Sequence, residues 1–238
     1  MSATTHPNPV FVAVDTDSTE TAKALCHGLK GTIGGIKLGK QFFMAEGPAG
    51  VKAVMPRDLP LFLDLKLHDI PNTVAGAVSS VASRVAPAFL TIHASGGAAM
   101  VAAAREAADR FGADRPRLLA VTVLTSLGDD DLVAMGVPNG AAAQVLRLAR
   151  LAIANGADGI VCSPQEVAML RRELGPEPLL VIPGIRPAGS DVGDQKRVMT
   201  PAEAMAAGAS RLVIGRPITG AADPAAAALA IAREVGAA

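Results

Sequence analysis

Eight short apolar segments that alternate with helical patterns constrain the fold more than any other feature of the sequence. They are expected to be strands at residues 10–14, 33–38, 61–66, 88–93, 117–124, 159–162, 179–182 and 211–214. Their nearly continuous apolar character is typical of parallel strands buried on both faces. Eight such units in 238 residues predict an α/β fold, a (β/α)8 or TIM barrel with a single domain over residues 1–238.

Helical patterns fill the intervals between these segments, and capping residues or prolines mark several helix starts. The expected helices cover 19–30, 41–55 with an interruption at Gly47-Pro48, 98–111, 141–154, 201–207 and 224–234, and others follow Pro71, Asp131 and Ser163-Pro164. An open doubly wound sheet is the alternative. It would need a glycine-rich turn after the first strand, where Asp15-Thr16-Asp17 stands. No linker divides the chain, and residues 1–9 are expected to be a flexible N-terminus.

The composition argues against several classes of function. Lys and Arg total 22, as do Asp and Glu, so the formal net charge is zero and no electrostatic footprint for nucleic acid exists. Trp and Tyr are absent, which argues against a surface for stacking bases. No apolar run approaches the ~20 residues of a membrane span. Cys26 and Cys162 belong to no metal-like cluster, so we expect reduced thiols in a cytoplasmic protein without a signal peptide.

A charged stretch, Asp64-Leu65-Lys66-Leu67-His68-Asp69, follows the apolar third strand. In a regular strand side chains alternate, so Asp64 and Lys66 should share one face while the flanking leucines occupy the other. Carboxylates close to a lysine favour its protonated form. Such a group suits a proton donor with a negative charge held near the reacting atom. Taken alone, the same pattern also fits a buried ion-pair network that only stabilises the fold.

Polar residues mark the carboxyl ends of the other strands, which is where barrels of this type place their reactive groups. These residues are Asp15, Lys37, His93, Thr125, Ser163, Arg186 and Arg216. Asp15 and Ser163 can also act as helix caps, and His93 is expected to support the site rather than to react. Two late loops suit a phosphate, because glycine allows close approach and arginine offers a bidentate fork. They are 183–187, continuing through Asp194-Gln195, and 215–219.

Five motifs in order, LDLKLHDIPNT, VLTS, PGIR, DQKRVMTPAEA and GRPIT, resemble the orotidine 5′-phosphate decarboxylases of the bacterial type. The resemblance extends from Val10 to the C-terminus. Related barrel enzymes that act on sugar phosphates, including 3-keto-gulonate 6-phosphate decarboxylase, share Asp-x-Lys-x-x-Asp. They typically bind magnesium and lack the following Ile-Pro-Asn-Thr. A magnesium-dependent sugar-phosphate decarboxylase is therefore the alternative function.

The resemblance implies decarboxylation of orotidine 5′-monophosphate to UMP without a metal or an organic cofactor. It makes Lys66 the proton donor, with Asp64 beside the departing carboxylate. Asp69 would reach the partner's site in a homodimer and complete an array with Lys37, Asp64 and Lys66. The resemblance also implies that Asp15 and Lys37 contact the ribose, assisted by Thr73, and that Thr125 and Ser126 face the pyrimidine ring. Four residues would hold the phosphate: Arg186, Gln195, Gly215 and Arg216. Ile70 and Pro183 are further implied substrate contacts.

Overall fold

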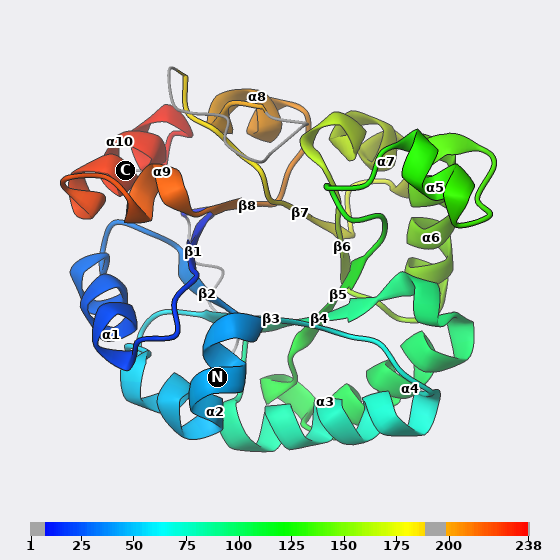
Figure 1. Ribbon diagram of the computed structural model, residues 1–238, viewed down its shortest axis with the longest axis horizontal. Coiled ribbons are helices and arrows are strands. Elements are labelled where there is room, and N and C mark those ends of the chain that lie inside the picture. Colours follow the sequence, from blue (N-terminus) through cyan, green and yellow to red (C-terminus); the bar gives the residue numbers. More distant parts are fainter. Residues whose placement is uncertain (1–7, 189–198, 238) are drawn as a thin grey trace.

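Eight parallel strands pair in sequence order and close into a barrel, which confirms the expected fold. The computed structural model describes residues 8–188 and 199–237, so Gln195 lies outside the described residues. Figure 1 shows the strands as a ring that the helices surround. The strands are β1 Val10–Val14, β2 Gly35–Gly39, β3 Leu61–Leu67, β4 Phe89–His93, β5 Arg117–Val121, β6 Gly159–Val161, β7 Leu179–Ile182 and β8 Arg211–Ile214.

The helices start close to where caps and prolines predict them. They are α1 Thr19–Gly28, α2 Lys40–Val54, α3 Pro71–Val85, α4 Ala98–Asp109, α5 Asp129–Ala134, α6 Gly140–Ala154, α7 Val167–Leu174, α8 Pro201–Ala206, α9 Arg216–Thr219 and α10 Pro224–Glu234, with single 3-10 turns at Ala94–Gly96, Gly112–Asp114 and Pro164–Glu166. The Ser18 side chain caps α1 by accepting from the Thr21 N–H, and Asp223 caps α10 in the same way. No helix in the described part of the chain is both long and apolar enough to cross a membrane.

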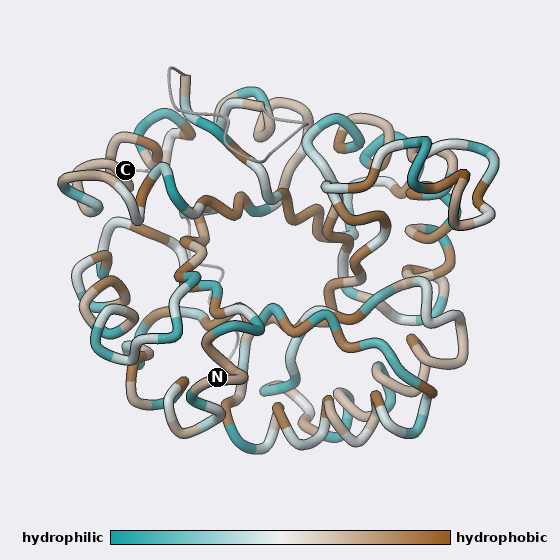
Figure 2. The backbone as a smooth tube through the Cα atoms, viewed as in Figure 1, coloured by the Kyte–Doolittle hydropathy of each residue, from teal (hydrophilic) through white to brown (hydrophobic). Residues whose placement is uncertain are grey.

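Two apolar layers hold the barrel together, one between strands and helices and one inside the ring. The apolar colouring of the strand ring in Figure 2 reflects both layers. Inside the ring, Phe11, Phe62 and Phe89 contact one another edge to face, with ring centroids 5.5–6.3 Å apart. These buried rings close the barrel across its middle and separate its two ends.

Two expected strand ends are wrong, one by two residues and one by three. The second strand starts at Gly35 rather than at residue 33, and β5 ends at Val121 rather than at residue 124. The pairing partners set these limits, because β6 offers only Gly159–Val161 to β5 and its last pair joins Val121 to Val161. Ser163 is the N-cap residue of the 3-10 turn Pro164–Glu166, as expected. Its backbone N–H donates to Glu166 Oε2 at 2.7 Å, while its hydroxyl has no hydrogen-bond partner among the described residues.

The carboxyl end of β3 is irregular, although Asp64 and Lys66 share one face and the flanking leucines pack on the other, as predicted. The pairing of β3 with β4 shifts register between Leu63 and Leu67. Lys66 has a φ of 49°, in the left-handed region that non-glycine residues rarely occupy. Its N–H donates to the side-chain hydroxyl of Thr91 at 2.8 Å, and this bond supports the unusual conformation. Strain of this kind collects at functional sites.

Candidate active site

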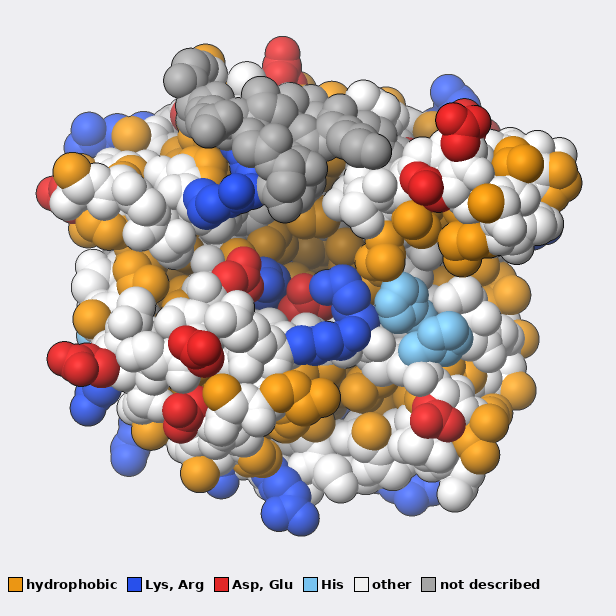
Figure 3. Space-filling view, viewed as in Figure 1, with side chains coloured by type: hydrophobic (Ala, Val, Ile, Leu, Met, Phe, Trp, Pro, Cys, Tyr) orange, Lys and Arg blue, Asp and Glu red, His pale blue; other side chains and the backbone are white. Residues whose placement is uncertain are grey.

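Four charged side chains of alternating sign meet at the carboxyl ends of β1, β2 and β3. Lys66 Nζ lies 2.7 Å from Asp64 Oδ2, and Lys37 Nζ lies 3.7 Å from the same oxygen. Lys37 Nζ also lies 3.1 Å from Asp15 Oδ1. Figure 3 shows acidic and basic side chains together in the hollow at the centre of this face. Lys37, Asp64 and Lys66, three members of the predicted array, therefore lie together, and Asp15 adjoins them through Lys37.

The group runs from an exposed edge to a buried centre. The Asp15 side chain is 61% exposed, whereas those of Lys37 and Asp64 are 10% and 12% exposed and that of Lys66 is 28% exposed. Asp15 does not cap α1, because Ser18 does so. Lys66 therefore keeps enough access to meet a ligand, while Lys37 and Asp64 are fixed behind it.

Opposing effects act on the pKa of Asp64. Burial disfavours the charged carboxylate, but attraction by Lys37 and Lys66 and hydrogen bonds from Lys66 and Thr91 together outweigh it. The pKa of Asp64 is therefore lowered. Asp64 thus stays ionised at neutral pH and keeps a fixed negative charge next to the Lys66 ammonium.

Thr91 is a site residue that the sequence reasoning missed. Its fully buried hydroxyl donates to Asp64 Oδ1 at 2.8 Å and accepts from the Lys66 N–H at 2.8 Å. Thr91 thus connects the carboxylate to the backbone of the lysine. A polar residue at the centre of the apolar strand Phe89–His93 was the available signal.

Two histidines lie beside the group. The rings of His68 and His93 are 5.3 Å apart, and Figure 3 shows them next to the charged hollow. Burial, followed by the positive fields of His68, Lys66 and Lys40, lowers the pKa of His93 from 6.5 to about 4. His93 is therefore neutral at pH 7, which fits the expectation of a supporting role.

The residues just after β3 lie on the rim and do not join the charged group within one chain. Asp69 is exposed, and its carboxylate accepts from the Ile70 N–H at 2.6 Å. The Ile70 side chain is 66% exposed, and Thr73 is exposed in the first turn of α3. Among the described residues, no ion pair involves Asp69. Its predicted role in a second subunit's site stays a prediction.

The expected phosphate and pyrimidine residues that the structure describes lie at the same end of the barrel. Thr125 and Ser126 form a turn after β5, and Pro183 directly follows β7. Arg186 is only 9% exposed, and its backbone N–H donates to the Met199 carbonyl at 3.0 Å. Gly215 is the N-cap residue and Arg216 the first residue of the short helix α9 after β8, where the backbone N–H groups of a helix start favour an anion.

Comparisons of the sequence and of the structure with known proteins identify the same family. A sequence model described as the "Orotidine 5'-phosphate decarboxylase / HUMPS family" matches residues 8–231 of this chain. Curated relatives named orotidine 5′-phosphate decarboxylase, from Paramagnetospirillum magneticum and Rhodospirillum rubrum, are 56% and 57% identical over 233 residues. These matches cover 96% of this chain and 99% and 94% of the relatives. The crystal structure of orotidine 5′-phosphate decarboxylase from Lactobacillus acidophilus is similar, with a TM-score of 0.84 and 39% identity over 96% of this chain and 99% of that chain.

Proposed function

This chain belongs to the orotidine 5′-phosphate decarboxylase / HUMPS family, and from this membership we infer that it decarboxylates orotidine 5′-monophosphate to UMP. This carboxy-lyase reaction is the last step of de novo pyrimidine synthesis. The site observation that carries the assignment is the Lys66 ammonium, 2.7 Å from a buried carboxylate at the open end of the barrel. Relatives with more than 50% sequence identity to this chain are named orotidine 5′-phosphate decarboxylase. They support the same chemistry and do not favour the sugar-phosphate alternative.

Lys66 supplies the proton in this proposal. When the bond between C6 and the carboxylate breaks, its electron pair stays on C6 and carbon dioxide leaves. The nearby ammonium stabilises the developing negative charge, which no metal or organic cofactor absorbs in this scheme. Lys66 then transfers a proton to C6, and solvent returns one to the lysine.

Asp64 distinguishes substrate from product. It is ionised and held in place by Lys37, Lys66 and Thr91. A carboxylate on C6 of the substrate repels it, and this repulsion disappears when carbon dioxide leaves. Binding energy from the distant phosphate offsets the unfavourable contact in the bound substrate.

The other predicted site residues bind the rest of the substrate. We assign Asp15, Lys37 and Thr73 to the ribose, Thr125 and Ser126 to the pyrimidine ring, Arg186, Gln195, Gly215 and Arg216 to the phosphate, and Ile70 and Pro183 to further contacts. The places of β7 and β8 support the phosphate assignment, because the loops after these two strands are the usual phosphate site in this fold.

We further propose that the enzyme works as a homodimer in the cytoplasm and that Asp69 acts in the site of the partner. Asp69 and Ile70 protrude from the rim after β3, and an exposed isoleucine next to an exposed carboxylate suits an interface. An Asp69 supplied by a second subunit would extend the alternating order of charge beyond Lys66.

The decisive test is an ultraviolet assay of orotidylate loss in the presence of EDTA. The chain is expected to consume orotidylate and release one carbon dioxide for each UMP, at a rate that EDTA does not change. Lys66→Ala is expected to lower kcat by about a thousandfold or more, because both charge stabilisation and proton transfer are lost. Lys23→Ala, on the exposed face of α1, is the matched control. Loss of activity with EDTA would favour the magnesium-dependent alternative, and near-normal turnover by Lys66→Ala would exclude Lys66 as the donor.

A further inference from the structure

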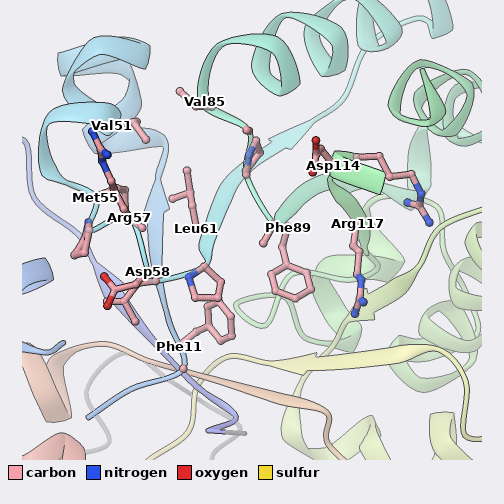
Figure 4. A pocket seen from close by; sticks show the side chains of 18 of the residues that line it. Phe11, Val51, Met55, Arg57, Asp58, Leu61, Val85, Phe89, Asp114 and Arg117 are labelled. Atoms are coloured by element: carbon pink, nitrogen blue, oxygen red, sulfur yellow. The ribbon is translucent and has the colours of Figure 1, made fainter. Parts of the chain in front are cut away.

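A second cavity opens at the opposite, amino-terminal end of the barrel. Its volume is about 1090 Å³, and it lies beyond the aromatic layer that closes the barrel. Its lining includes the first residues of β3, β4, β5 and β8. Figure 4 shows the side chains of Phe11, Phe89 and Arg117 directed into one space, with Leu61 and Arg57 on the same wall. No role proposed above uses this end of the molecule.

Two arginines enter this cavity from inside the strand ring. Side chains two positions apart in a strand share a face, so Arg117 lies on the face of Leu119 and Arg211 on the face of Val213. Leu119 and Val213 pack with the three phenylalanines in the barrel interior. Arg117 and Arg211 therefore extend the interior towards the amino-terminal opening and place two positive charges beneath the aromatic rings.

These two charges have no carboxylate partner in the part of the chain that the structure describes. Arg211 donates to the Ser210 carbonyl at 2.6 Å, and no ion pair forms at either arginine there. Residues 1–7 contain no Asp or Glu that could supply one. Burial, and after it the charge of Arg117, lowers the pKa of Arg211. Two like charges in a partly buried space are unfavourable unless an anion joins them.

The other charged groups of the lining do not neutralise the arginines. Asp58 pairs with Lys30 at 3.0 Å, and Arg115 pairs with Asp158 at 2.6 Å. Asp114 is exposed, and the lining also contains the positive charges of Lys52 and Arg57. An excess of positive charge therefore remains in the cavity.

We propose that the amino-terminal mouth of the barrel is a second binding site, which takes a small, multiply charged phosphate compound on Arg117 and Arg211. A guanidinium offers two parallel N–H groups that match the oxygens of a phosphate. Two such forks, with Arg57 and Lys52 nearby, suit a diphosphate group better than a single negative charge. The apolar wall of Leu61, Phe89 and Pro87 can cover an uncharged part of the ligand. The site faces away from Lys66 and is independent of the decarboxylase assignment.

The test is a calorimetric titration of the full chain with inorganic pyrophosphate at 0.15 M salt. Arg117→Gln/Arg211→Gln is expected to weaken one binding event at least tenfold and to leave decarboxylation unchanged. Arg216→Gln, at the opposite end, is expected to leave that event intact, and Arg147→Gln on α6 controls for the loss of a surface charge. Unchanged affinity in the double variant would overturn the site, as would loss of all pyrophosphate binding in Arg216→Gln.

Two further measurements test whether weaker binding reflects misfolding and whether the site prefers phosphate to other anions. Arg211→Lys keeps the charge and loses the fork, so it is expected to bind pyrophosphate several times more weakly while melting at the wild-type temperature. Wild-type affinity in this variant would contradict a role for the guanidinium. Citrate is expected to bind more weakly than pyrophosphate, and equal affinity for citrate would overturn the assignment to phosphate.

Discussion

At the scale of single residues, Thr91 determines how the reactive pair is held. Its hydroxyl both donates to the Asp64 carboxylate and accepts from the Lys66 N–H. A hydrogen bond to a charged group contributes about 1.5–3 kcal/mol, and a buried carboxylate that loses one is destabilised accordingly. The left-handed backbone of Lys66 depends on the same hydroxyl. A fixed threonine therefore sets the direction from which the ammonium meets a substrate.

We predict that Thr91→Val lowers the free energy of unfolding by about 2 kcal/mol and kcat by roughly tenfold, with a smaller effect on KM. Urea denaturation and steady-state kinetics measure both effects. Thr122→Val is the matched control, because the Thr122 hydroxyl makes one long bond of 3.3 Å to the Val161 carbonyl. Wild-type kcat in a folded Thr91→Val protein would show that Thr91 does not position the pair.

His93 makes the stability depend on pH in a defined window. Its pKa is lowered to about 4 in the folded protein, whereas an unfolded histidine has a pKa near 6.5. Between these values the unfolded state binds more protons, so acidification favours unfolding. The contribution of His93 to the free energy of unfolding is therefore complete above pH 6.5 and is lost as the pH falls towards 4. Asp64, whose pKa is also lowered, loses its contribution at a lower pH, beginning near its unfolded value of about 3.9.

The predicted result is a melting temperature that falls from pH 6.5 to pH 4 in the wild type and falls less in His93→Asn. Calorimetric scans at half-unit steps measure the two curves. His27→Asn, on the exposed face of α1, should follow the wild type. Parallel curves for His93→Asn and the wild type would mean that His93 is not buried in its neutral form.

At the scale of elements, the kink in α2 allows its two halves to run in different directions, the first leading away from β2 and the second packing against the barrel. The helix begins at Lys40, directly after the strand that carries Lys37, and its second half packs Val51 and Val54 against the barrel. Gly47 lies between the two halves with a φ of 61° and a ψ of −166°, a conformation that is nearly exclusive to glycine. The sequence signal Gly47-Pro48 predicted this interruption correctly.

We expect Gly47→Ala to lower the free energy of unfolding by about 1–3 kcal/mol. An added methyl group meets nothing within 4 Å, so the loss reflects backbone strain alone. Gly28→Ala at the end of α1 also meets nothing within 4 Å, but its backbone is helical, so it should stabilise by up to about 1 kcal/mol. Equal effects of the two substitutions in chemical denaturation would contradict this account of the kink.

At the scale of the whole molecule, the barrel interior changes character along its axis. The carboxyl end carries Lys37 and Asp64, the middle is aromatic and the amino end carries Arg117 and Arg211. The buried aromatic layer separates the two charged ends. The electrostatics of each end can therefore be changed independently.

Mixed dimers test whether the sites are shared between subunits. Lys66→Ala and Asp69→Ala proteins are each expected to be inactive, whereas a re-equilibrated equal mixture should recover about a quarter of wild-type activity, because each heterodimer contains one intact site. Native mass spectrometry measures whether heterodimers form. An inactive mixture that contains heterodimers would show that Asp69 does not act across an interface.

The sequence predicts the barrel well, because buried parallel strands have continuous apolar segments that do not depend on distant partners. It also predicts the Asp64–Lys66 contact, since both residues lie at the end of one strand. It does not predict the left-handed Lys66 or the role of Thr91, because both depend on pairing with β4. The approach of Arg117 to Arg211 likewise requires closure of the ring, which joins strands distant in sequence.

The most direct test of the central claim is a crystal structure of the chain with bound UMP. We predict Lys66 Nζ within about 3.5 Å of pyrimidine C6, still paired with Asp64, and the phosphate at Arg186 and Arg216. A structure in which UMP occupies the carboxyl end of the barrel while Lys66 points away from C6 would contradict it.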